Sequence, residues 1–285
     1  MAKNYRAELI FLLGDPVDGN PTGAVEEAAF VHKGLSWRYI NCLVPVEDLG
    51  VAFQGVKALG GRGLNLTMPH KIAIIPMLDE LTQAAQLIGA VNTVYVREGR
   101  YIGENTDGKG FVQSLVEADI PLQGKVVTLL GAGGAARAIG MECALAGARH
   151  IHVINRDQGR GQSLVDALNA SGRTQADFDP WQGDMTIPAD TDILVNATSI
   201  GLHPHGEEYP PIDYSTVGPG MAVCDVVFNP ARTVFLNKCA ARGAQAVTGL
   251  GMLVNQAALN FSLWTGETAP RELMMRTLSR ELEDS

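Results

Sequence analysis

The sequence predicts an α/β protein of two domains, and three observations lead to this fold class. Short apolar segments alternate with helical stretches along most of the 285 residues. From about residue 120, the apolar segments are continuous, which is typical of parallel strands covered on both faces. The chain is also long enough for two ordinary domains. We therefore expect an N-terminal α/β domain followed by a domain built on a doubly wound parallel sheet.

The first domain is expected at residues 1–107. Apolar segments rich in β-forming residues predict its strands, at 7–14, 37–44, 63–67, 92–96 and 100–105, the last two as a pair. Helical periodicity predicts its helices, at 22–35, 46–61 and 78–90, with Gly89 as the C-terminal cap of the last.

The second domain is expected at residues 108–251. Its predicted parallel strands lie at 125–131, 150–155, 192–198, 222–228 and 244–249. Beyond this domain, apolar residues recur at helical spacing, which predicts a C-terminal helical segment at 252–285.

Composition and charge exclude several classes of protein. Hydrophobic residues make up 46% and charged residues 19%, which predicts a packed core rather than disorder. The net charge of −9 argues against a nucleic-acid or anionic-membrane partner. No apolar run approaches the roughly 18 residues of a membrane span, and the apolar segment at 9–14 is interpreted as a buried strand rather than a signal peptide. These observations predict a cytoplasmic protein.

Neither the cysteines nor the histidines form a strong metal motif. The four cysteines are widely spaced, which favours buried free thiols: Cys42, Cys143, Cys224 and Cys239. Among the histidines, we single out His203-x-His205, followed by Glu207 and Glu208, for its ligand-like spacing. It lies in a Pro-rich loop, and we expect no metal site.

A glycine-rich turn provides the strongest local signal. The motif G-x-G-x-x-A occurs at Gly131, Gly133 and Ala136, directly after an apolar strand and before a helical run of small residues. The first glycine permits the tight turn, the second lets the backbone approach a pyrophosphate, and the alanine allows close helix–strand packing. The helix N-terminus offers free N–H groups to the phosphates. This context predicts a Rossmann-type dinucleotide site.

The segment after the next strand should contact the adenosine ribose, but its residues give conflicting signals. Arg156 and Arg160 suit a 2′-phosphate and favour NADP. Asp157 can accept hydrogen bonds from the ribose hydroxyls and would repel that phosphate, which favours NAD. We expect NAD or NADP, with a slight preference for NAD.

Three segments of the first domain end an apolar stretch with asparagine and threonine: Asn65–Thr67, Asn92–Thr93 and Asn105–Thr106. Their side chains offer donors and acceptors that suit a substrate bearing several hydroxyl groups. Lys71 follows the first segment and Asp107 the last. A lysine and an aspartate can move the proton that accompanies hydride transfer to a nicotinamide. The alternative is a simple Lys71–Asp107 ion pair.

Seven motifs together resemble the shikimate/quinate dehydrogenase family: GLNLTMPHK, GAVNTV, GENTDGKGF, GAGGAARAI, NATSIG, DVVFNPARTVFL and GLGMLVNQAALNFSLWTG. The resemblance spans nearly the whole chain. It implies an N-terminal substrate domain, completed by C-terminal helices at 252–285, and a Rossmann cofactor domain. The implied reaction is the NAD(P)-dependent interconversion of shikimate and 3-dehydroshikimate, or of quinate and 3-dehydroquinate.

The resemblance also implies roles for individual residues. Proton transfer would be carried by Lys71 and Asp107. The substrate would be held by residues that include Asn20, Thr22, Asn65, Thr67, Asn92, Phe228 and Gln256. The cofactor would be bound by Gly131, Gly133, Gly134, Ala135, Asn155, Arg156, Asp157, Arg160, Thr198, Gly249 and Met252.

Two departures from the family pattern concern the substrate. The family usually reads His-Ser-x-Ser-Pro where it holds the substrate carboxylate, but this chain has Asn20 and Thr22 in place of the two serines. Phe228 stands where the family usually has a tyrosine, so one phenolic hydroxyl is missing. Losing a buried hydrogen bond costs about 1–3 kcal/mol. The preferred substrate is therefore left open between shikimate, quinate, an amino-shikimate and a related ring alcohol.

The leading hypothesis is an enzyme that takes a small polyhydroxy carboxylate and acts as a monomer or homodimer. A second hypothesis, from a different class, is a nucleotide-sensing binding protein that kept the fold but lost efficient turnover. Intact Lys71, Asp107 and the glycine turn favour catalysis, whereas Asn20 and Phe228 leave room for the second hypothesis. A reductase for an unrelated carbonyl would leave the Asn/Thr segments without a role.

Overall fold

A computed structural model describes residues 5–283, and the chain divides into two compact units. Unit 1 consists of the chain up to Thr106 together with the chain from Gln256 onward, and unit 2 consists of Asp107–Asn255. The second division falls inside a continuous helix, α9 (Gly249–Thr265). Each unit contains its own sheet.

The sheet of unit 1 is mixed, with the strand order β2-β1-β3-β5-β6-β4. Parallel pairs join β1 to both β2 and β3, whereas β3, β5 and β6 pair in antiparallel fashion. Its strands are β1 (Glu8–Gly14), β2 (Trp37–Leu43), β3 (Gly63–Leu66), β4 (Glu80–Leu81), β5 (Thr93–Arg97) and β6 (Arg100–Glu104). The expected strand pair at 92–105 is confirmed as β5 and β6.

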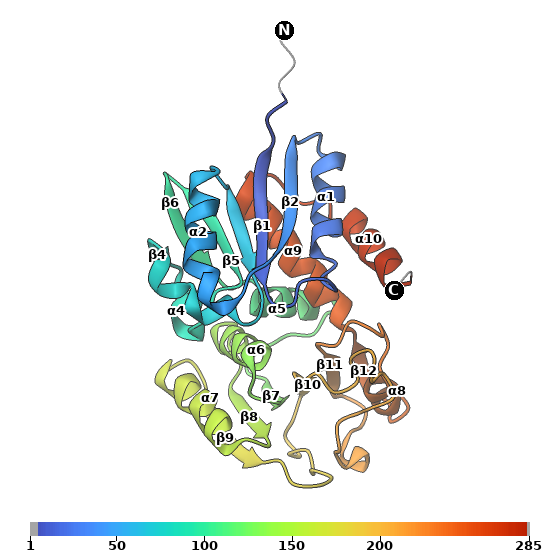
Figure 1. The fold of residues 1–285 in the computed structure, drawn as a ribbon. Coiled ribbons are helices and arrows are strands. Elements are labelled where there is room, and N and C mark those ends of the chain that lie inside the picture. Colours follow the sequence, from blue (N-terminus) through green and yellow to red (C-terminus); the bar gives the residue numbers. More distant parts are fainter. Residues whose placement is uncertain (1–4, 284–285) are drawn as a thin grey trace. The chain divides into compact units, whose positions relative to one another are not determined.

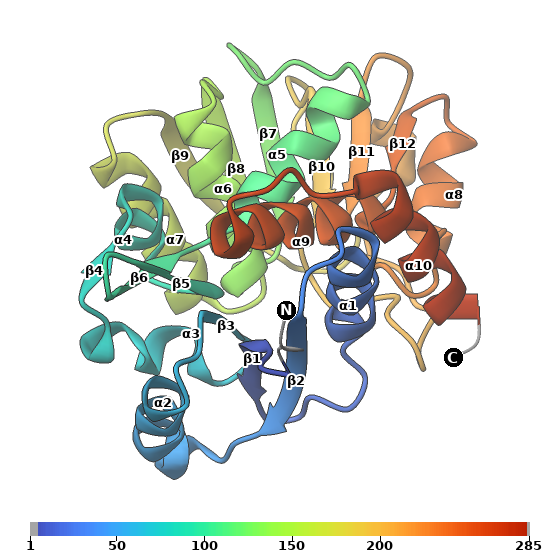
Figure 2. The ribbon, with the colours of Figure 1, turned by 90° about the horizontal axis from the view of Figure 1, so that it is seen from above.

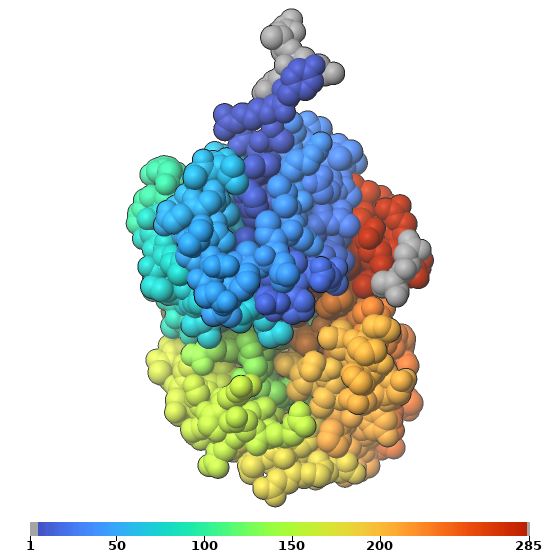
Figure 3. All heavy atoms as spheres, viewed as in Figure 1, coloured from blue at the N-terminus to red at the C-terminus, as the bar shows by residue number. Residues whose placement is uncertain are grey.

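Helices cover both faces of this sheet. Figures 1 and 2 show α2 on one face and α1 and α9 on the other, and α10 packs against α1. The helices are α1 (Thr22–His32), α2 (Leu49–Ala58), α3 (His70–Ala73), α4 (Gln83–Ile88) and α10 (Arg271–Glu283), with short 3-10 turns at Val46–Asp48 and Ile75–Met77. The apolar segment near the N-terminus is confirmed as the buried strand β1. The described residues just before it, in dark blue in Figure 3, project from unit 1.

One expected helix of unit 1 differs from the structure. Residues 78–90 were predicted to be helical throughout, but Glu80–Leu81 form the short edge strand β4, which pairs with β6. The helix begins only after Thr82, whose hydroxyl accepts a hydrogen bond from the Ala85 N–H and caps the first turn. Gly89 ends α4 with a left-handed conformation (φ 70°), as predicted.

Aromatic packing joins α9 to the sheet. The Trp264 Nε1 donates to the Val94 carbonyl at 2.9 Å, and the rings of Phe261 and Phe30 stack with centroids 5.6 Å apart. Gly63 permits this packing, because a Cβ at that position would lie only 2.4 Å from the Trp264 Nε1. The last part of the chain is therefore part of the core of unit 1.

The sheet of unit 2 is entirely parallel, with the order β12-β11-β10-β7-β8-β9. Its strands are β7 (Val126–Leu130), β8 (His150–Asn155), β9 (Gln175–Pro180), β10 (Ile193–Asn196), β11 (Ala222–Asp225) and β12 (Gln245–Val247). The parallel sheet is confirmed. Strand β9 was not predicted, because its polar sequence QADFDP is that of an exposed edge strand and lacks the continuous apolar run of its neighbours.

The helices of unit 2 cover opposite faces of its sheet. They are α5 (Asp107–Glu117), α6 (Gly134–Leu145), α7 (Gln158–Ala170) and α8 (Val234–Ala240), with a 3-10 turn at Tyr214–Thr216. On one face, Leu130 and Leu194 join a core cluster with Phe235 of α8. On the other, the backbone of α6 at Gly140 approaches Leu129. The strand order reverses between β7 and β10, which is the switch point where such sheets bind dinucleotides.

Within the described residues, no helix is both long enough and apolar enough to cross a membrane. All four cysteines are free thiols, as predicted. Cys143, Cys224 and Cys239 are buried, and burial raises the pKa of each thiol. Cys42 is only half-buried, which corrects the expectation that all four would be buried. It lies on β2, several of whose side chains are exposed.

Candidate functional site

The polar ends of the unit 1 strands form one buried hydrogen-bond network. The Asn65 amide donates to the Thr93 hydroxyl at 2.8 Å, and the Asn92 amide donates to the Thr106 hydroxyl at 3.0 Å. The hydroxyl groups of Thr93 and Thr106 both donate to the Asn260 Oδ1, each at 2.7 Å. The three Asn/Thr segments noted in the sequence are thus joined in one network that includes a residue of α9.

Asn260 was not identified from the sequence, although a signal was present. Polar Gln256 and Asn260 and the indole of Trp264 recur every four residues in an apolar helix, which places them on one face of α9. The Asn260 amide donates to the Gln256 Oε1 at 3.0 Å. That bond uses the carbonyl oxygen of Gln256, so its amide N–H groups are the part suited to an acceptor on a substrate.

The network limits what Asn65 can offer to a ligand. Its two amide hydrogens go to the Asn92 carbonyl (3.0 Å) and the Thr93 hydroxyl (2.8 Å), and its Oδ1 accepts from the Tyr39 hydroxyl at 2.8 Å. An amide nitrogen has only two hydrogens, so Asn65 retains acceptor capacity alone. Its principal role in this structure is to join β3 to β2 and β5.

Lys71 lies in a short turn of helix that is anchored on both sides. The preceding residue, His70, is fully buried, and its Nε2 contacts the Val44 carbonyl at 2.8 Å. The Lys71 carbonyl accepts from the Val91 N–H at 2.8 Å, and the Thr67 carbonyl accepts from the His70 N–H at 2.9 Å. The sequence NLTMPHK thus places the lysine at the carboxyl end of β3 on a fixed backbone.

Asn20 and Thr22 lie at the start of α1. The Asn20 Oδ1 accepts from the N–H of Thr22, the first residue of the helix, at 3.0 Å, which leaves the amide hydrogens of Asn20 as its donors. Thr22 is 7% exposed. The asparagine that stands in place of a serine is therefore fixed by a hydrogen bond to the first residue of the helix that follows it.

A buried carboxyl group one turn further along α1 was not anticipated. Glu26 is fully buried, and neither of its carboxylate oxygens has a hydrogen-bond partner among the described residues. Burial raises the pKa of Glu26 well above its ordinary value. Burial, and then the charge of Glu26, also raise the pKa of Tyr39, whose hydroxyl bonds to Asn65. A buried carboxyl group with a raised pKa therefore lies close to the polar network.

In unit 2, the glycine turn has the geometry expected of a phosphate site. Gly131 has φ +109°, and a Cβ there would lie 2.9 Å from the Thr198 side chain. At Gly133 and Gly134 a Cβ would meet nothing within 4 Å, so the backbone at the start of α6 is open to a ligand. Ala136 is fully buried against the sheet. These features fit a pyrophosphate at the α6 N-terminus.

The loop after β8 is ordered by Asp157. Its Oδ1 accepts from the Arg160 N–H at 2.9 Å and caps α7, while its Oδ2 lies 3.9 Å from the Arg160 Nε. The Asn155 amide donates to the Asp157 backbone carbonyl at 2.7 Å. Arg156, Asp157 and Arg160 are all exposed. The carboxylate of Asp157, which favours NAD, therefore lies beside the guanidinium of Arg160, which favours NADP.

A second buried carboxyl, Asp225, organises the loops that follow β10 and β11. Its oxygens accept from the Asn196 amide (3.0 Å), the Val227 N–H (3.0 Å) and the Thr233 hydroxyl (2.7 Å). The Asn196 Oδ1 in turn accepts from the Thr198 hydroxyl at 2.6 Å. Burial raises the pKa of Asp225 to about 6, although these hydrogen bonds oppose the shift.

The remaining predicted residues lie around these loops. Phe228 follows β11 and is half-buried. Gly249 begins α9 against the Val227 carbonyl, where a Cβ would lie 2.5 Å away, and Met252 lies in the next turn and is half-buried. Asp107 is the first residue of α5 in unit 2, whereas Lys71 belongs to unit 1. Their pairing for proton transfer stays a prediction.

Comparison with known proteins identifies the class of protein. Residues 12–94 match the model of a shikimate dehydrogenase substrate binding domain, and residues 249–278 that of a shikimate 5'-dehydrogenase C-terminal domain. A shikimate dehydrogenase (NADP(+)) of Desulforamulus reducens is 38% identical over 98% of this chain and 97% of its own. The fold and these relatives define an NAD(P)-dependent oxidoreductase.

Solved structures show the same relationship. A 5-ketofructose reductase of Gluconobacter sp. strain CHM43 has a TM-score of 0.93 and 42% identity, covering 97% of this chain and 99% of its own. A Listeria monocytogenes shikimate 5-dehydrogenase in complex with shikimate and NAD has a TM-score of 0.91 and 32% identity. The match covers 96% of this chain and 97% of its own. The chain belongs to the shikimate dehydrogenase family, which confirms the resemblance.

The buried Asp225 predicts a specific pH dependence of stability. Its folded pKa of about 6 exceeds its ordinary value of 3.8, so the folded state holds a proton that the unfolded state releases between these pH values. The stability associated with the neutral carboxyl is complete below pH 3.8 and lost as the pH rises through about 6. Relative to Asp225→Asn, the wild-type free energy of unfolding should fall by about 3 kcal/mol between pH 3.5 and 7.5. Urea unfolding at several pH values measures this, and a constant difference would contradict it.

Proposed function

We propose that the protein interconverts a hydroxyl and a ketone on a small polyhydroxylated ring, with shikimate and 3-dehydroshikimate as the reference pair. Unit 1 supplies the substrate-binding domain and unit 2 the NAD(P)-binding domain. The observation that carries the proposal is the convergence of three Asn/Thr strand ends in one buried network in the same unit as Lys71. Such a network holds donors and acceptors in fixed positions for a ligand rich in hydroxyl groups.

The residues of unit 2 fit a nicotinamide dinucleotide. The cofactor supplies hydride transfer when it is bound. Gly133 and Gly134 with the α6 N-terminus would hold its pyrophosphate, and the loop from Asn155 to Arg160 would contact the adenosine ribose. Gly131, Ala135, Thr198, Gly249 and Met252 complete the proposed set.

The protein itself needs only to orient the substrate and move one proton. In oxidation, the neutral Lys71 Nζ takes the proton of the substrate hydroxyl; in reduction, the protonated amine returns it to the new alkoxide. Asp107 is proposed to fix the lysine and share the proton. The amide groups of Asn92 and Gln256 and the hydroxyl of Thr67 are proposed to bind the other ring hydroxyls.

A second substrate candidate is a neutral sugar ketone such as 5-ketofructose. The structural similarity to a 5-ketofructose reductase favours it. The start of α1 is also compatible with it, because the side-chain oxygen of Asn20 is already bonded to the Thr22 N–H. A neutral ketose needs no anion site, so this arrangement presents no obstacle to it.

Replacing the lysine tests the catalytic proposal. Lys71→Ala should lower kcat at least about 100-fold, because a general acid–base is lost. Binding of NADH or NADPH, followed by fluorescence titration, should persist. The control is Lys57→Ala, whose amine lies over the Phe53 ring on α2 and which should leave kcat unchanged. Unchanged turnover in Lys71→Ala would remove that residue from the mechanism.

A substrate panel separates the candidates. Initial rates are measured on shikimate, quinate, an amino-shikimate and 5-ketofructose, for the wild type and for Asn20→Ser with Thr22→Ser. The double substitution should raise kcat/KM on shikimate at least about 5-fold, equivalent to one hydrogen bond of about 1 kcal/mol, without raising it on 5-ketofructose. No gain on shikimate would mean that the carboxylate is held elsewhere. Nucleotide binding with no turnover on any of the four would favour the nucleotide-sensing alternative.

The NAD/NADP ratio tests the ribose loop. We propose that Asp157 tilts the preference to NAD, although Arg156 and Arg160 beside it would accept a 2′-phosphate. Asp157→Ser keeps an N-cap for α7 but removes the negative charge, so it should improve kcat/KM with NADP relative to NAD about 10-fold, equivalent to roughly 1.4 kcal/mol. The charge-retaining control is Asp157→Glu. A ratio that does not move in Asp157→Ser would exclude this carboxylate as the selector.

A further inference from the structure

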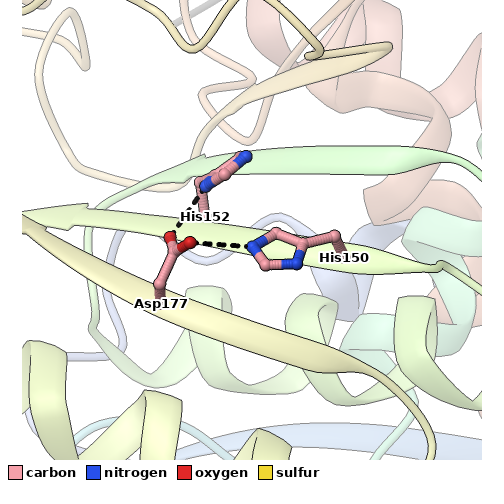
Figure 4. Close-up of side chains that lie close together, drawn as sticks. All are labelled: His150, His152 and Asp177. Atoms are coloured by element: carbon pink, nitrogen blue, oxygen red, sulfur yellow. Dashed lines mark hydrogen bonds and ion pairs between the residues drawn. The ribbon is translucent and has the colours of Figure 1, made fainter.

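In unit 2, a compact group of two histidine side chains and one aspartate side chain lies on one face of β8 and the edge strand β9. His150 and His152 are two residues apart on β8 and therefore lie on the same face of the sheet. Asp177 is the register partner of His152 on the neighbouring strand β9. Figure 4 shows both imidazole rings directed at the Asp177 carboxylate, one ring toward each oxygen.

The contacts within this group are short. The His150 Nε2 lies 2.9 Å from one Asp177 oxygen, and the His152 Nδ1 lies 2.7 Å from the other. One possible ligand atom from each of the three residues lies within 4.8 Å of the others. The imidazoles are mostly covered, with 20% and 13% of their side chains exposed, whereas that of Asp177 is 51% exposed. A solute can therefore reach the group from the side of the carboxylate.

A second carboxylate orients one of the rings. The His152 Nε2 lies 3.2 Å from the Asp190 Oδ1, on the far side of the ring from Asp177. The next residue, Thr191, is bound through its hydroxyl to Thr128 of β7 at 2.7 Å, so the segment that carries Asp190 is anchored to the sheet. A carboxylate behind a histidine is the usual support of a metal-binding imidazole.

The two contacts of His152 with carboxylates require a positive charge on this ring or beside it, either a second ring proton or a metal ion. A neutral imidazole has one N–H, but both nitrogens of His152 face a carboxylate oxygen. A metal ion at Nδ1, with the Nε2–H donated to Asp190, satisfies both sides at once. Two imidazole nitrogens and a carboxylate oxygen are the ligand set that zinc and related divalent metals prefer.

We infer that His150, His152 and Asp177 form a binding site for a divalent transition metal of the zinc class, with Asp190 as the residue that positions His152. Metal–ligand distances of about 2.0–2.2 Å require the present nitrogen–oxygen contacts to open slightly as the ion enters. Any proton on a coordinating nitrogen is released to solvent on binding. The ion would tie the edge strand β9 to β8, the strand that ends at the proposed ribose loop.

The test uses the full chain without a polyhistidine tag, stripped with chelator and titrated with Zn²⁺ by calorimetry. Bound metal per chain is counted by mass spectrometry. The wild type should bind one Zn²⁺ per chain with a dissociation constant of about 10 µM or tighter, and its Tm should rise. His150→Ala with His152→Ala should abolish stoichiometric binding. Asp190→Asn should weaken affinity about 10–100-fold, as expected for an orienting partner.

A matched control is available in the chain. His203 and His205 have the same His-x-His spacing, but the His205 Nδ1 lies 3.8 Å from Glu208 and both histidines are exposed. The variant with both replaced by alanine should bind Zn²⁺ like the wild type. Should the β8 double variant fold poorly, Asp177→Asn, which preserves shape, serves in its place. Less than one Zn²⁺ per wild-type chain at 100 µM, equal affinity in the β8 variants, or loss of binding in the control would each overturn the inference.

Discussion

The constraint on which unit 1 depends is that polar groups placed inside a core must find partners there. An unpartnered buried polar group costs about 1–3 kcal/mol, so the strand ends carrying Asn65, Asn92 and Thr93 can be buried only if they bond to one another. They do so through Asn260, whose single carbonyl oxygen accepts from two threonine hydroxyls. A residue from the far end of the chain is thereby required to complete the first domain.

The same constraint shapes the loops of unit 2. Asp225 is buried at the end of β11, and the groups that bond to it come from the end of β10, the loop after β11 and the start of α8. The glycine turn depends on this arrangement, because Gly131 packs against Ala197 and Thr198, and Thr198 is bonded to Asn196. The open backbone at Gly133 and Gly134 thus follows a turn that this network supports.

Much of this could be predicted from local sequence. The strands of unit 2, the turn at Gly131 and the cap at Gly89 follow from apolar runs and from backbone conformations that glycine favours. Asn260 could not be assigned a role in this way, because its partners Thr93 and Thr106 lie far along the chain. The burial of Glu26 and Asp225 is set by the tertiary fold and not by a local pattern. Strand β9 and the pair His150 and His152 were missed for a related reason: a polar edge strand gives a weak pattern, and the spacing of the two histidines becomes meaningful only with Asp177 opposite.

The sequence by itself determined the class of fold, the family and the position of the glycine turn, since each depends on residues close together in the chain or on motifs in a recognisable order. Only the tertiary structure decided which polar groups already have hydrogen-bond partners within the protein. It left Asn65 with acceptor capacity alone, directed the Asn20 side-chain oxygen at the first N–H of α1 and placed two histidine side chains of β8 around one carboxylate of β9. The physical reason is that hydrogen-bond satisfaction is a property of the folded neighbourhood, which no local pattern encodes.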